Sequence, residues 1–373
     1  MNRPKVAIVH DWLTNLGGAE RTVLSILNAF PDADLYTSVY DDKGIDLFRG
    51  YRVHTTWLQK IPGRLKYKHQ LWSVLRPLAF RSLRLDDYDI VITSSSAESK
   101  HARTKNGVNI CYCHTPIRYY WVNPEKYMKD PGLGPLNWLA PFALKLLLPL
   151  LKRSDYRAAQ KVDLFIANSK AVKKRIKEFY GQESTVLYPP VRVGSFKPSK
   201  KRASYFVTAG RQVAYKRHDL AVSACSELGL ELLVLGSGPE NEKLKNSAGP
   251  TITFNSSASD EDIIRAFSES IGFIHPGEED FGITPIEAMA GGTPVIAYKA
   301  GGALDYVEPG KTGEFFDAQT SASLQKILAD FTVKNYSPGR ITKHAQKFSE
   351  AEFAKKLKKL VEKKAAGSLE SES

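Results

Sequence analysis

The stretch from residue 271 to residue 298 limits the possible folds more than any other part of the chain. A buried strand at 271–274 leads into a polar turn, and residues 285–290 have the composition of a short helix. Two glycines end that helix, and an apolar strand follows at 293–297. This alternation of strand and helix indicates an α/β fold. A helix N-terminus after a strand presents unpaired N–H groups and a positive dipole end, which suit a phosphate.

Two glutamates of this stretch are candidate binding residues. Glu279 lies in the turn and Glu287 lies eight positions later inside the helix, so they cannot share a site as a carboxylate pair would. Each can instead bind a different hydroxyl-rich part of one long ligand, because an ionised carboxylate only accepts hydrogen bonds and suits vicinal hydroxyls. Taken alone, two glutamates at this spacing are also compatible with a solvated turn and helix.

The motif Glu-x7-Glu, followed by Ala-Met-Ala-Gly-Gly-Thr-Pro-Val-Ile-Ala, resembles the retaining glycosyltransferases of family 4, which have the GT-B fold. The resemblance implies two Rossmann-like α/β domains that face a central cleft and bind a nucleotide-sugar. It implies that the donor sugar and β-phosphate lie near Glu279, Phe281, Gly282 and Ile283. Glu287 would then hold the ribose.

The length of the chain fits this architecture. It has 373 residues, 42% of them hydrophobic, which is enough for two α/β domains with packed cores. Its three cysteines are not spaced as a disulfide framework, which favours a reducing compartment. The N-terminus enters a strand at residues 6–9 without a signal peptide, and no long uncharged apolar run predicts a membrane span. We therefore expect a cytoplasmic protein.

The first strand of the chain, at residues 5–10, is followed by Gly17-Gly18 and an amphipathic helix. Glycines let the backbone approach a phosphate closely, although this stretch lacks the Gly-x-Gly-x-x-Gly dinucleotide fingerprint. A Gly-Gly pair alone is also compatible with an ordinary turn. In the resembled family the matching glycines face the donor diphosphate and the acceptor, which implies that role for Gly17 and Gly18.

A strand near residue 110 ends in Cys111-Tyr112-Cys113-His114. This order could suggest zinc, but a second ligand pair at matching spacing is missing. The resemblance implies instead that His114 contacts the donor sugar by hydrogen bonding and orientation, without nucleophilic attack. A histidine satisfied by local contacts is the alternative. The segment from His114 to Trp121 is most similar to the mannosyltransferase-like branch, which suggests GDP-mannose as the donor.

The second half of the chain restarts with a strand that ends in Gly210-Arg211, and Lys216 follows before a helix. Both cations can neutralise a diphosphate. The resemblance implies that Arg211 and Lys216 bind the donor diphosphate and stabilise it as it leaves, in place of a metal. Gly236 lies in a later strand–glycine turn beside the expected nucleotide pocket. We predict no cofactor and no essential metal.

Two Asp-x-Asp triplets, at 32–34 and 87–89, match the spacing of metal-binding carboxylates in the other large glycosyltransferase fold. Both lead straight into apolar runs, which favours strand-start residues. The domains are expected at 1–189, on the acceptor side, and at 190–339, where the nucleotide-sugar binds. A Lys-rich helix at about 340–364 is expected to cross back to the first domain, and 367–373 to form a disordered tail.

The net charge of +13 is unevenly distributed. Residues 49–85 hold nine Lys or Arg and no acid, interleaved with Trp and Leu, and 135–153 is strongly apolar and ends in two cations. Such composition fits contact with an anionic membrane or cover for a lipid-bearing acceptor, but also fits surface helices packed on their own domain. Nucleic acid is not expected, because no recognisable nucleic-acid module is present.

The sequence therefore predicts a metal-independent, retaining glycosyltransferase. It would move a hexose, mannose from GDP-mannose, onto a saccharide or lipid-linked saccharide at the inner face of the cell membrane. One alternative is an enzyme of the same fold that uses a UDP-sugar. Another, from a different class, is a basic protein that binds RNA or anionic lipid and has a degenerate sugar site.

Overall fold

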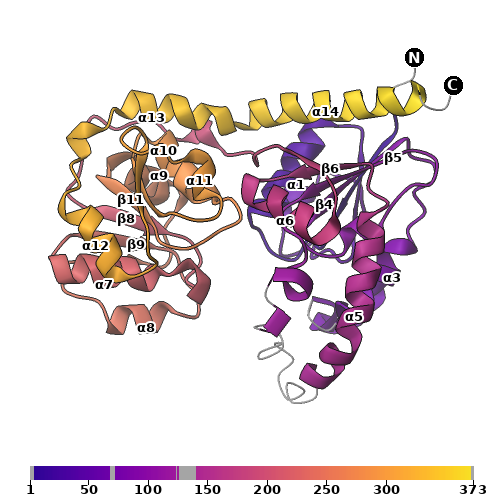
Figure 1. The fold of residues 1–373 in the computed structure, drawn as a ribbon, viewed down its shortest axis with the longest axis horizontal. Coiled ribbons are helices and arrows are strands. Elements are labelled where there is room, and N and C mark those ends of the chain that lie inside the picture. The colour runs from indigo at the N-terminus through magenta and orange to yellow at the C-terminus, as the bar shows by residue number, and fades with distance from the viewer. Residues whose placement is uncertain (1–3, 68–71, 123, 126–139, 371–373) are drawn as a thin grey trace. The chain divides into compact units, whose positions relative to one another are not determined.

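The computed structural model describes residues 4–67, 72–122, 124–125 and 140–370, which form two compact units (Figure 1). The N-terminal unit comprises Met1–Tyr188 together with Phe353–Ser373, and the C-terminal unit comprises Pro189–Glu352. The second unit thus begins beside the boundary expected near residue 190. The two Rossmann-like α/β halves expected from the sequence are confirmed.

The N-terminal unit is built on a seven-stranded sheet with the order β3-β2-β1-β4-β5-β6-β7, in which every pair is parallel. Its strands are β1 (Val6–His10), β2 (Asp34–Thr37), β3 (Val53–Thr55), β4 (Ile90–Ser95), β5 (Val108–Cys113), β6 (Leu164–Ala167) and β7 (Ser184–Val186). The winding direction reverses between β1 and β4. In open parallel sheets, ligands bind outside the carboxyl ends of the strands at such a reversal.

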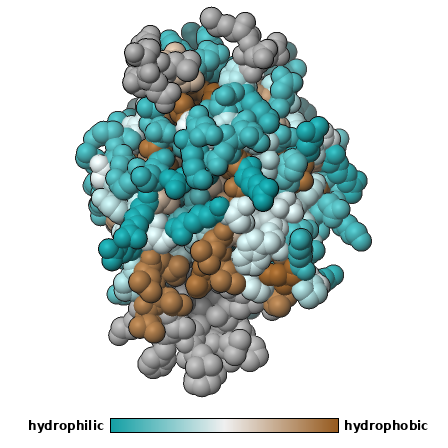
Figure 2. All heavy atoms as spheres, turned by 90° about the vertical axis from the view of Figure 1, so that its right-hand side faces the viewer, coloured by the Kyte–Doolittle hydropathy of each residue, from teal (hydrophilic) through white to brown (hydrophobic). Residues whose placement is uncertain are grey.

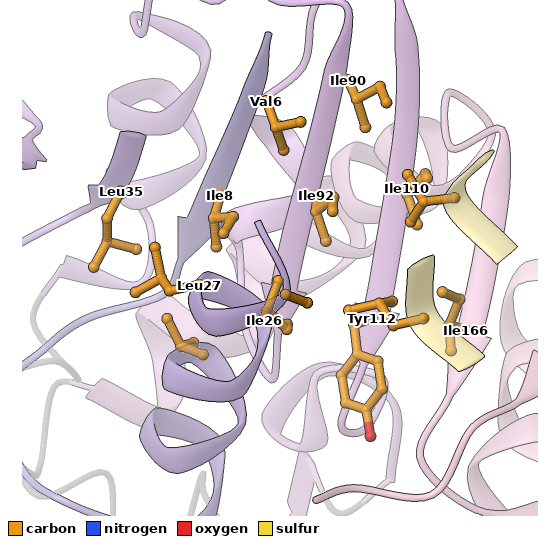
Figure 3. Close-up of a cluster of buried hydrophobic side chains, with 14 of the residues drawn as sticks. Val6, Ile8, Ile26, Leu27, Leu35, Ile90, Ile92, Ile110, Tyr112 and Ile166 are labelled. Atoms are coloured by element: carbon orange, nitrogen blue, oxygen red, sulfur yellow. The ribbon is translucent and has the colours of Figure 1, made fainter. Parts of the chain in front are cut away.

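Helices cover both faces of this sheet because its central strands are apolar on both sides. The longer ones are α1 (Gly18–Ala29), α3 (Arg76–Arg81), α5 (Ala140–Ala159), α6 (Lys170–Tyr180) and α14 (Glu350–Glu370), with short turns η1 (Asp46–Phe48), η2 (Trp57–Lys60), η3 (Gly63–Tyr67), η4 (Ser99–His101) and η5 (Arg118–Val122). On one face Ile8 and Ile92 pack against Ile26 and Leu27 of α1 (Figure 3), and Phe353 of α14 joins the same core. On the other face α6 packs on β5 and β6.

The C-terminal unit contains a six-stranded parallel sheet in the order β10-β9-β8-β11-β12-β13. Its strands are β8 (Phe206–Ala209), β9 (Leu232–Leu235), β10 (Ile252–Asn255), β11 (Gly272–His275), β12 (Val295–Tyr298) and β13 (Gly313–Phe316). Its helices are α7 (His218–Leu228), α8 (Asn241–Asn246), α9 (Asp260–Glu269), α10 (Ile283–Ala290), α11 (Ala303–Tyr306), α12 (Ser321–Ala329) and α13 (Pro338–Ala345), with turns η7 (Val193–Ser195), η8 (Ala214–Lys216), η9 (Val333–Asn335) and η10 (Gln346–Phe348). Here the winding reverses between β8 and β11.

The Lys-rich segment expected as one helix at 340–364 is two helices, α13 and α14, separated by η10 and Ser349. Ser349 is extended, and its hydroxyl accepts a hydrogen bond from Glu352 N–H at the start of α14. The amphipathic pattern continues through the break because each half buries its apolar face in a different unit: Phe348 in the C-terminal one and Phe353 in the N-terminal one. The expected disordered tail at 367–373 is also partly wrong, since α14 continues to Glu370.

Of the two segments considered for membrane contact, the first is divided among several short elements and the described part of the second belongs to one helix. Within 49–85 the described residues form β3, η2, η3 and α3, and residues 68–71 lie outside the described part. Of 135–153, residues from 140 onward belong to α5, which contains Pro149, and the earlier ones lie outside the described part. Within the described ranges, no helix combines the length and hydrophobicity needed to cross a bilayer.

Candidate functional site

An ion pair at the carboxyl edge of the C-terminal sheet brings together two of the residues singled out in the sequence. Lys216 ends η8, which follows β8, and Glu279 lies in the turn after the neighbouring strand β11. Lys216 Nζ lies 3.0 Å from Glu279 Oε1, with 16% and 21% of the two side chains exposed. The pair therefore lies where the sheet reverses its winding, the usual ligand position in such sheets.

Each member of the pair keeps its partner charged. Burial tends to raise the pKa of the Glu279 carboxyl, but the Lys216 ammonium outweighs it and the pKa lies below its ordinary value. Burial tends to lower the pKa of Lys216, and Glu279 reverses that effect, so this pKa is raised. At neutral pH the site therefore presents an ammonium and a carboxylate, which suit a phosphate and a hydroxyl-rich group respectively.

Two buried histidines beside this pair were not singled out in the sequence. Burial, with the nearby Lys216 charge, lowers the pKa of both His218 and His275 to about 4, so both rings are neutral at pH 7. Nδ1 of His218 is 3.0 Å from Thr208 Oγ1, and its Nε2 has no hydrogen-bond partner in the described part of the chain. The signal that could have revealed them is their position, one at the end of β11 and the other at the start of α7.

Glycines allow the turn after β11 to lie directly on neighbouring backbone. A Cβ on Gly277 would lie 2.8 Å from Lys216 Cα, so only glycine permits this approach between the turn and η8. Gly302 N–H donates to the Glu279 carbonyl at 2.9 Å, which fixes the backbone that carries the carboxylate. The loop at 300–302 therefore supports the backbone of Glu279.

The N-terminus of α10 follows this turn. Its cap residue, Gly282, has φ = 90°, and a Cβ there would lie 2.9 Å from Tyr306 Oη. The N–H groups of Ile283 and Thr284 make no backbone hydrogen bond with the described residues, as expected for a first helical turn. The ring of Phe281 packs against Tyr306, so its backbone is the part that can face a ligand. These N–H groups can bind a phosphate.

Arg211 and the glycine loop after β9 lie at the same edge of the sheet. The Arg211 side chain is exposed, and no hydrogen bond or ion pair links it to another described residue. Gln212, which the sequence analysis missed, is buried and donates through Nε2 to the Gly236 carbonyl at 2.7 Å. Gly236 has φ = 101°, and a Cβ there would lie 2.5 Å from the Gly210 carbonyl oxygen. The need for glycine at this position is thus explained by loop packing.

Glu287 of α10 has a different cation from Glu279. Arg192 Nη2 lies 3.9 Å from Glu287 Oε1, and the same guanidinium approaches Asp260 at 3.5 Å. Arg192 lies just after the expected domain boundary between residues 189 and 190 and was not singled out in the sequence. The two glutamates therefore do not form a carboxylate pair, and the expectation that Glu287 binds a ribose stays a prediction.

In the N-terminal unit, a row of polar side chains connects His114 with the Gly17-Gly18 turn. Ser94 Oγ lies 2.8 Å from His114 Nε2 and 3.2 Å from His10 Nδ1. His10 Nε2 lies 3.7 Å from Glu20 Oε1. Gly17 caps α1, but its N–H donates to Glu20 Oε2 at 2.8 Å. The Gly17 N–H is thus already used by the chain, and the expected position of Gly17 and Gly18 at the diphosphate and acceptor stays a prediction.

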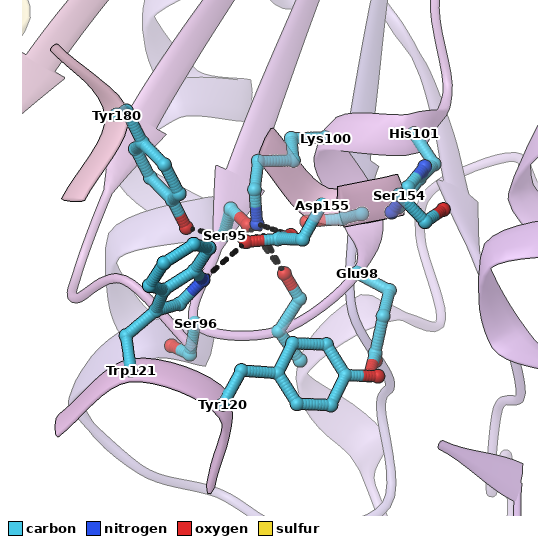
Figure 4. A network of polar contacts seen from close by, with 12 residues as sticks. Ser95, Ser96, Glu98, Lys100, His101, Tyr120, Trp121, Ser154, Asp155 and Tyr180 are labelled. Atoms are coloured by element: carbon cyan, nitrogen blue, oxygen red, sulfur yellow. Dashed lines mark hydrogen bonds and ion pairs between the residues drawn. The ribbon is translucent and has the colours of Figure 1, made fainter. Parts of the chain in front are cut away.

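A second polar cluster holds the segment after His114 (Figure 4). Asp155 of α5 accepts hydrogen bonds from Trp121 Nε1 and Tyr180 Oη, both at 2.8 Å, and pairs with Lys100 at 2.7 Å. Beside it, Glu98 pairs with Arg76 at 2.6 Å and accepts hydrogen bonds from Tyr119 and Tyr120. Three consecutive side chains of η5 are thereby anchored, which fixes the course of the chain beyond His114.

The geometry gives no support to the two metal sites considered in the sequence, the Asp-x-Asp triplets and the Cys111–His114 stretch. Asp34 accepts a hydrogen bond from Tyr88 Oη at 2.6 Å, and Asp89 accepts one from Lys5 N–H at 2.7 Å, so both serve as strand-start residues. Cys111 and Cys113 are buried free thiols. Among the described residues, no three acidic, histidine or cysteine side chains form a group that could hold a metal. Metal independence stays a prediction.

Two families match successive parts of the chain. Residues 16–194 match the family described as Glycosyltransferase Family 4, and residues 195–351 match Glycosyl transferases group 1. The chain is 40% identical to a GDP-mannose-dependent alpha-mannosyltransferase of Mycolicibacterium smegmatis over 30% of this chain and 31% of that relative's length. It is 24% identical to the alpha-1,3/1,6-mannosyltransferase ALG2 of Mus musculus over 96% of both chains.

Solved structures share the fold. HepE of Anabaena, determined in complex with UDP-glucose, aligns with a TM-score of 0.68 and 16% identity over 98% of this chain and 99% of its own. Sucrose-phosphate synthase of Thermosynechococcus elongatus aligns with a TM-score of 0.71 and 18% identity over 98% of this chain and 100% of its own. At such identities the likeness concerns the fold alone.

Proposed function

Because this chain belongs to the family 4 glycosyltransferases of the GT-B fold, we propose that it transfers a mannosyl group from GDP-mannose to an acceptor hydroxyl with retention of configuration. The observation that carries the proposal is the Lys216–Glu279 pair at the reversal of the C-terminal sheet. In it a cation for the diphosphate and a carboxylate for the sugar hydroxyls are held 3.0 Å apart.

The proposed roles divide the donor into three parts. Lys216 and the exposed Arg211 bind the diphosphate, together with the first N–H groups of α10. Glu279 accepts hydrogen bonds from sugar hydroxyls, and Glu287 binds the ribose. For His114 we propose hydrogen bonding to the donor sugar, and for the Gly17-Gly18 turn contact with the donor diphosphate and the acceptor.

In the proposed reaction the bond between the anomeric carbon and the β-phosphate oxygen breaks. The acceptor oxygen forms its bond on the same face of the sugar, and its proton passes to the departing phosphate oxygen. Lys216 and Arg211 stabilise the negative charge that develops on the diphosphate, which is the largest contribution that this site can make. Glu279 is ion-paired, which suits it to holding hydroxyls better than to nucleophilic attack.

The proposal is tested by substituting each member of the pair with alanine. We expect Glu279→Ala and Lys216→Ala each to lower transfer from GDP-mannose about 100- to 1,000-fold, as when an electrostatic stabiliser is removed. Lys299→Ala is the matched control, because Lys299 pairs with Asp317 at 3.1 Å in the same unit but on the exposed surface. Near-normal turnover in both site variants would overturn the assignment.

The nucleotide is a separate question, because relatives that use GDP-mannose and neighbours solved with UDP share this fold. We propose GDP, supported by the mannosyltransferases among the relatives. Thermal-shift titration with GDP and UDP distinguishes the two: stabilisation by UDP alone would favour the alternative donor.

Metal independence is also part of the proposal. We expect transfer to persist in the presence of EDTA. Loss of transfer in EDTA that Mg²⁺ or Mn²⁺ restores would contradict metal independence.

We also propose that the N-terminal unit contacts an anionic membrane through α3 and α5, where it would meet a lipid-linked acceptor. Arg81 of α3 donates to Ser154 of α5 at 2.7 Å, so the two helices lie side by side. Leu78 and Leu150, about one turn earlier on each helix, are exposed by 54% and 64%. Figure 2 shows apolar surface gathered on this face of the unit. Exposed leucines beside cations favour the surface of an anionic bilayer.

Flotation with liposomes tests this contact. We expect binding to vesicles that contain anionic lipid, weakened in Leu78→Ser/Leu150→Ser, while Leu228→Ser/Leu304→Ser, which alters exposed leucines of the C-terminal unit, behaves as wild type. A protein that floats neither with anionic vesicles nor with vesicles lacking anionic lipid would refute the proposal.

The alternative of a basic binding protein with a degenerate sugar site makes a different prediction. Salt-sensitive RNA binding without any nucleotide-sugar turnover would favour that alternative.

A further inference from the structure

Three neighbouring strands of the N-terminal sheet end in the polar row that leads to His114. His10 ends β1 and lies opposite Ser94 of β4 in register, and His114 directly follows β5. Glu20, from the first turn of α1, completes the row. His10, Ser94 and Glu20 are buried, whereas the His114 ring is partly exposed. The row therefore leads from the protein interior to a ring that can meet a ligand.

The contacts of His10 determine where its protons lie. His10 Nδ1 is 3.1 Å from the Ser94 carbonyl oxygen, which can only accept, so Nδ1 carries a hydrogen. His10 Nε2 faces the Glu20 carboxylate at 3.7 Å, which favours a hydrogen there as well. Burial tends to lower the pKa of His10, but Glu20 outweighs it and the pKa is raised. The hydrogen on Nδ1 therefore points to Ser94, and Nε2 faces the Glu20 carboxylate.

The direction of the remaining hydrogen bonds follows from the hydrogen on His10 Nδ1. Ser94 Oγ, 3.2 Å from His10 Nδ1, shares the Nδ1 hydrogen with the Ser94 carbonyl and so acts as an acceptor. Its own hydrogen is then donated to His114 Nε2, which lies 2.8 Å away. If His114 Nε2 accepts this hydrogen it carries none itself, which places the ring hydrogen on Nδ1.

We propose that Glu20 and His10 are positioning residues, which act through Ser94 to hold His114 as the neutral Nδ1–H tautomer. The consequence for transfer rests on the proposed role of His114 at the donor sugar. A fixed tautomer gives the His114 ring one defined donor nitrogen and one defined acceptor nitrogen, and a neutral ring adds no positive charge near a bound sugar.

Glu20 makes a second contact outside the row, so a Glu20 variant is not a clean test of the row. Glu20 Oε2 also accepts the Gly17 N–H, so changing Glu20 disturbs both the row and the turn before α1. Ser94→Ala removes the hydroxyl between the two rings and leaves Gly17 untouched. Ser99→Ala is its matched control, because the buried Ser99 hydroxyl donates to the same Ser94 carbonyl at 3.1 Å but lies outside the row.

Nitrogen NMR of the full chain labelled in its histidines reads the tautomer directly and needs no substrate. The spectrum of His114→Ala identifies the His114 signals. We expect a protonated Nδ1 and an unprotonated Nε2 on His114 in the wild type and in Ser99→Ala, and a mixture of tautomers in Ser94→Ala. A wild-type His114 with its hydrogen on Nε2, or His114 signals that do not change in Ser94→Ala, would overturn the inference.

Kinetics then tests whether the tautomer matters. We expect Ser94→Ala to lower kcat for transfer about tenfold to hundredfold with little change in donor KM, as when the orienting partner of a functional histidine is removed. In a His114→Ala background the same change should cost less than about twofold, because Ser94 acts through that ring. An equal loss of kcat from Ser94→Ala in the wild type and in the His114→Ala background would contradict the positioning role. If the wild type transfers no sugar but the NMR result holds, the proposed function fails and the tautomer assignment stands.

Discussion

Each unit contains a lysine–carboxylate pair, and the two pairs are built for different purposes. In the N-terminal unit Lys100 lies 2.7 Å from Asp155, with 2% and 0% of the side chains exposed. Asp155 also accepts from Trp121 and Tyr180, and Lys100 donates to a backbone carbonyl (Figure 4). In the C-terminal unit the Lys216–Glu279 pair is partly exposed, and neither side chain has another polar side-chain partner among the described residues.

The difference shows what an ion pair needs in order to bind a ligand. The buried pair has its hydrogen bonds satisfied by the protein, so it fixes η5 and α5 and has little capacity left for anything else. At the carboxyl edge of the C-terminal sheet, the backbone of Gly210 and Gly277 lies against Lys216. The Lys216–Glu279 pair is partly exposed, so its remaining donors and acceptors can meet a ligand. Position relative to the sheet, more than residue type, distinguishes the two.

The largest effect is expected when the buried pair is broken. Lys100→Met leaves the Asp155 carboxylate buried without its cation, and we expect the free energy of unfolding of the N-terminal unit to fall by about 3–5 kcal/mol. All five tryptophans precede Pro189 in the sequence, so tryptophan fluorescence during denaturation reports on this unit. Lys105→Met is the control, because Lys105 pairs with Asp86 on the surface of the same unit. Equal stability of the two variants would contradict a structural role for the buried pair.

The loops of both units were predictable from the sequence, whereas the partners of their polar residues were not. Apart from the Glu-x7-Glu motif, the positions of Glu279, Lys216 and His114 after predicted strands are enough to place them at the carboxyl edges, because parallel strands that alternate with helices all end at the same edge. Among the partners that were missed, Arg192 is distant in the sequence from the residue it meets, Glu287. Gln212, His218 and His275 lie within four positions of Arg211, Lys216 and Glu279, but their burial and contacts appear only in the fold.

The N-terminal row shows the same limit. His10 and Ser94 are 84 positions apart in the chain and meet because β1 and β4 are neighbours in the sheet. No local pattern encodes that adjacency. The Glu20–Gly17 contact, by comparison, spans three positions and is a capping arrangement that residue spacing could have revealed.

A smaller effect, which sharpens the comparison, comes from the histidines beside the open pair. His218 and His275 have pKa values of about 4 in the folded protein, against 6.5 ordinarily, so the unfolded chain binds more protons between pH 6.5 and 4. Stability is therefore lost as pH falls through this range, by about 3 kcal/mol per histidine at pH 4. We expect His218→Asn to reduce this pH dependence in calorimetry. An unchanged slope between pH 6.5 and 4 would contradict a neutral buried ring.

The smallest stability change is expected at the open pair itself, and it separates binding from folding. Lys216→Met removes a partly exposed cation. The free-energy cost of burying this cation nearly cancels its attraction to Glu279, so we expect the free energy of unfolding of the C-terminal unit to change by less than about 1 kcal/mol. Calorimetry measures this change, and nucleotide titration of the same sample measures binding. If the pair forms a ligand site, the Lys216→Met variant should bind nucleotide weakly while its stability stays close to that of the wild type. Destabilisation as large as that of Lys100→Met would mean that both pairs are structural, and the contrast between the two units would be lost.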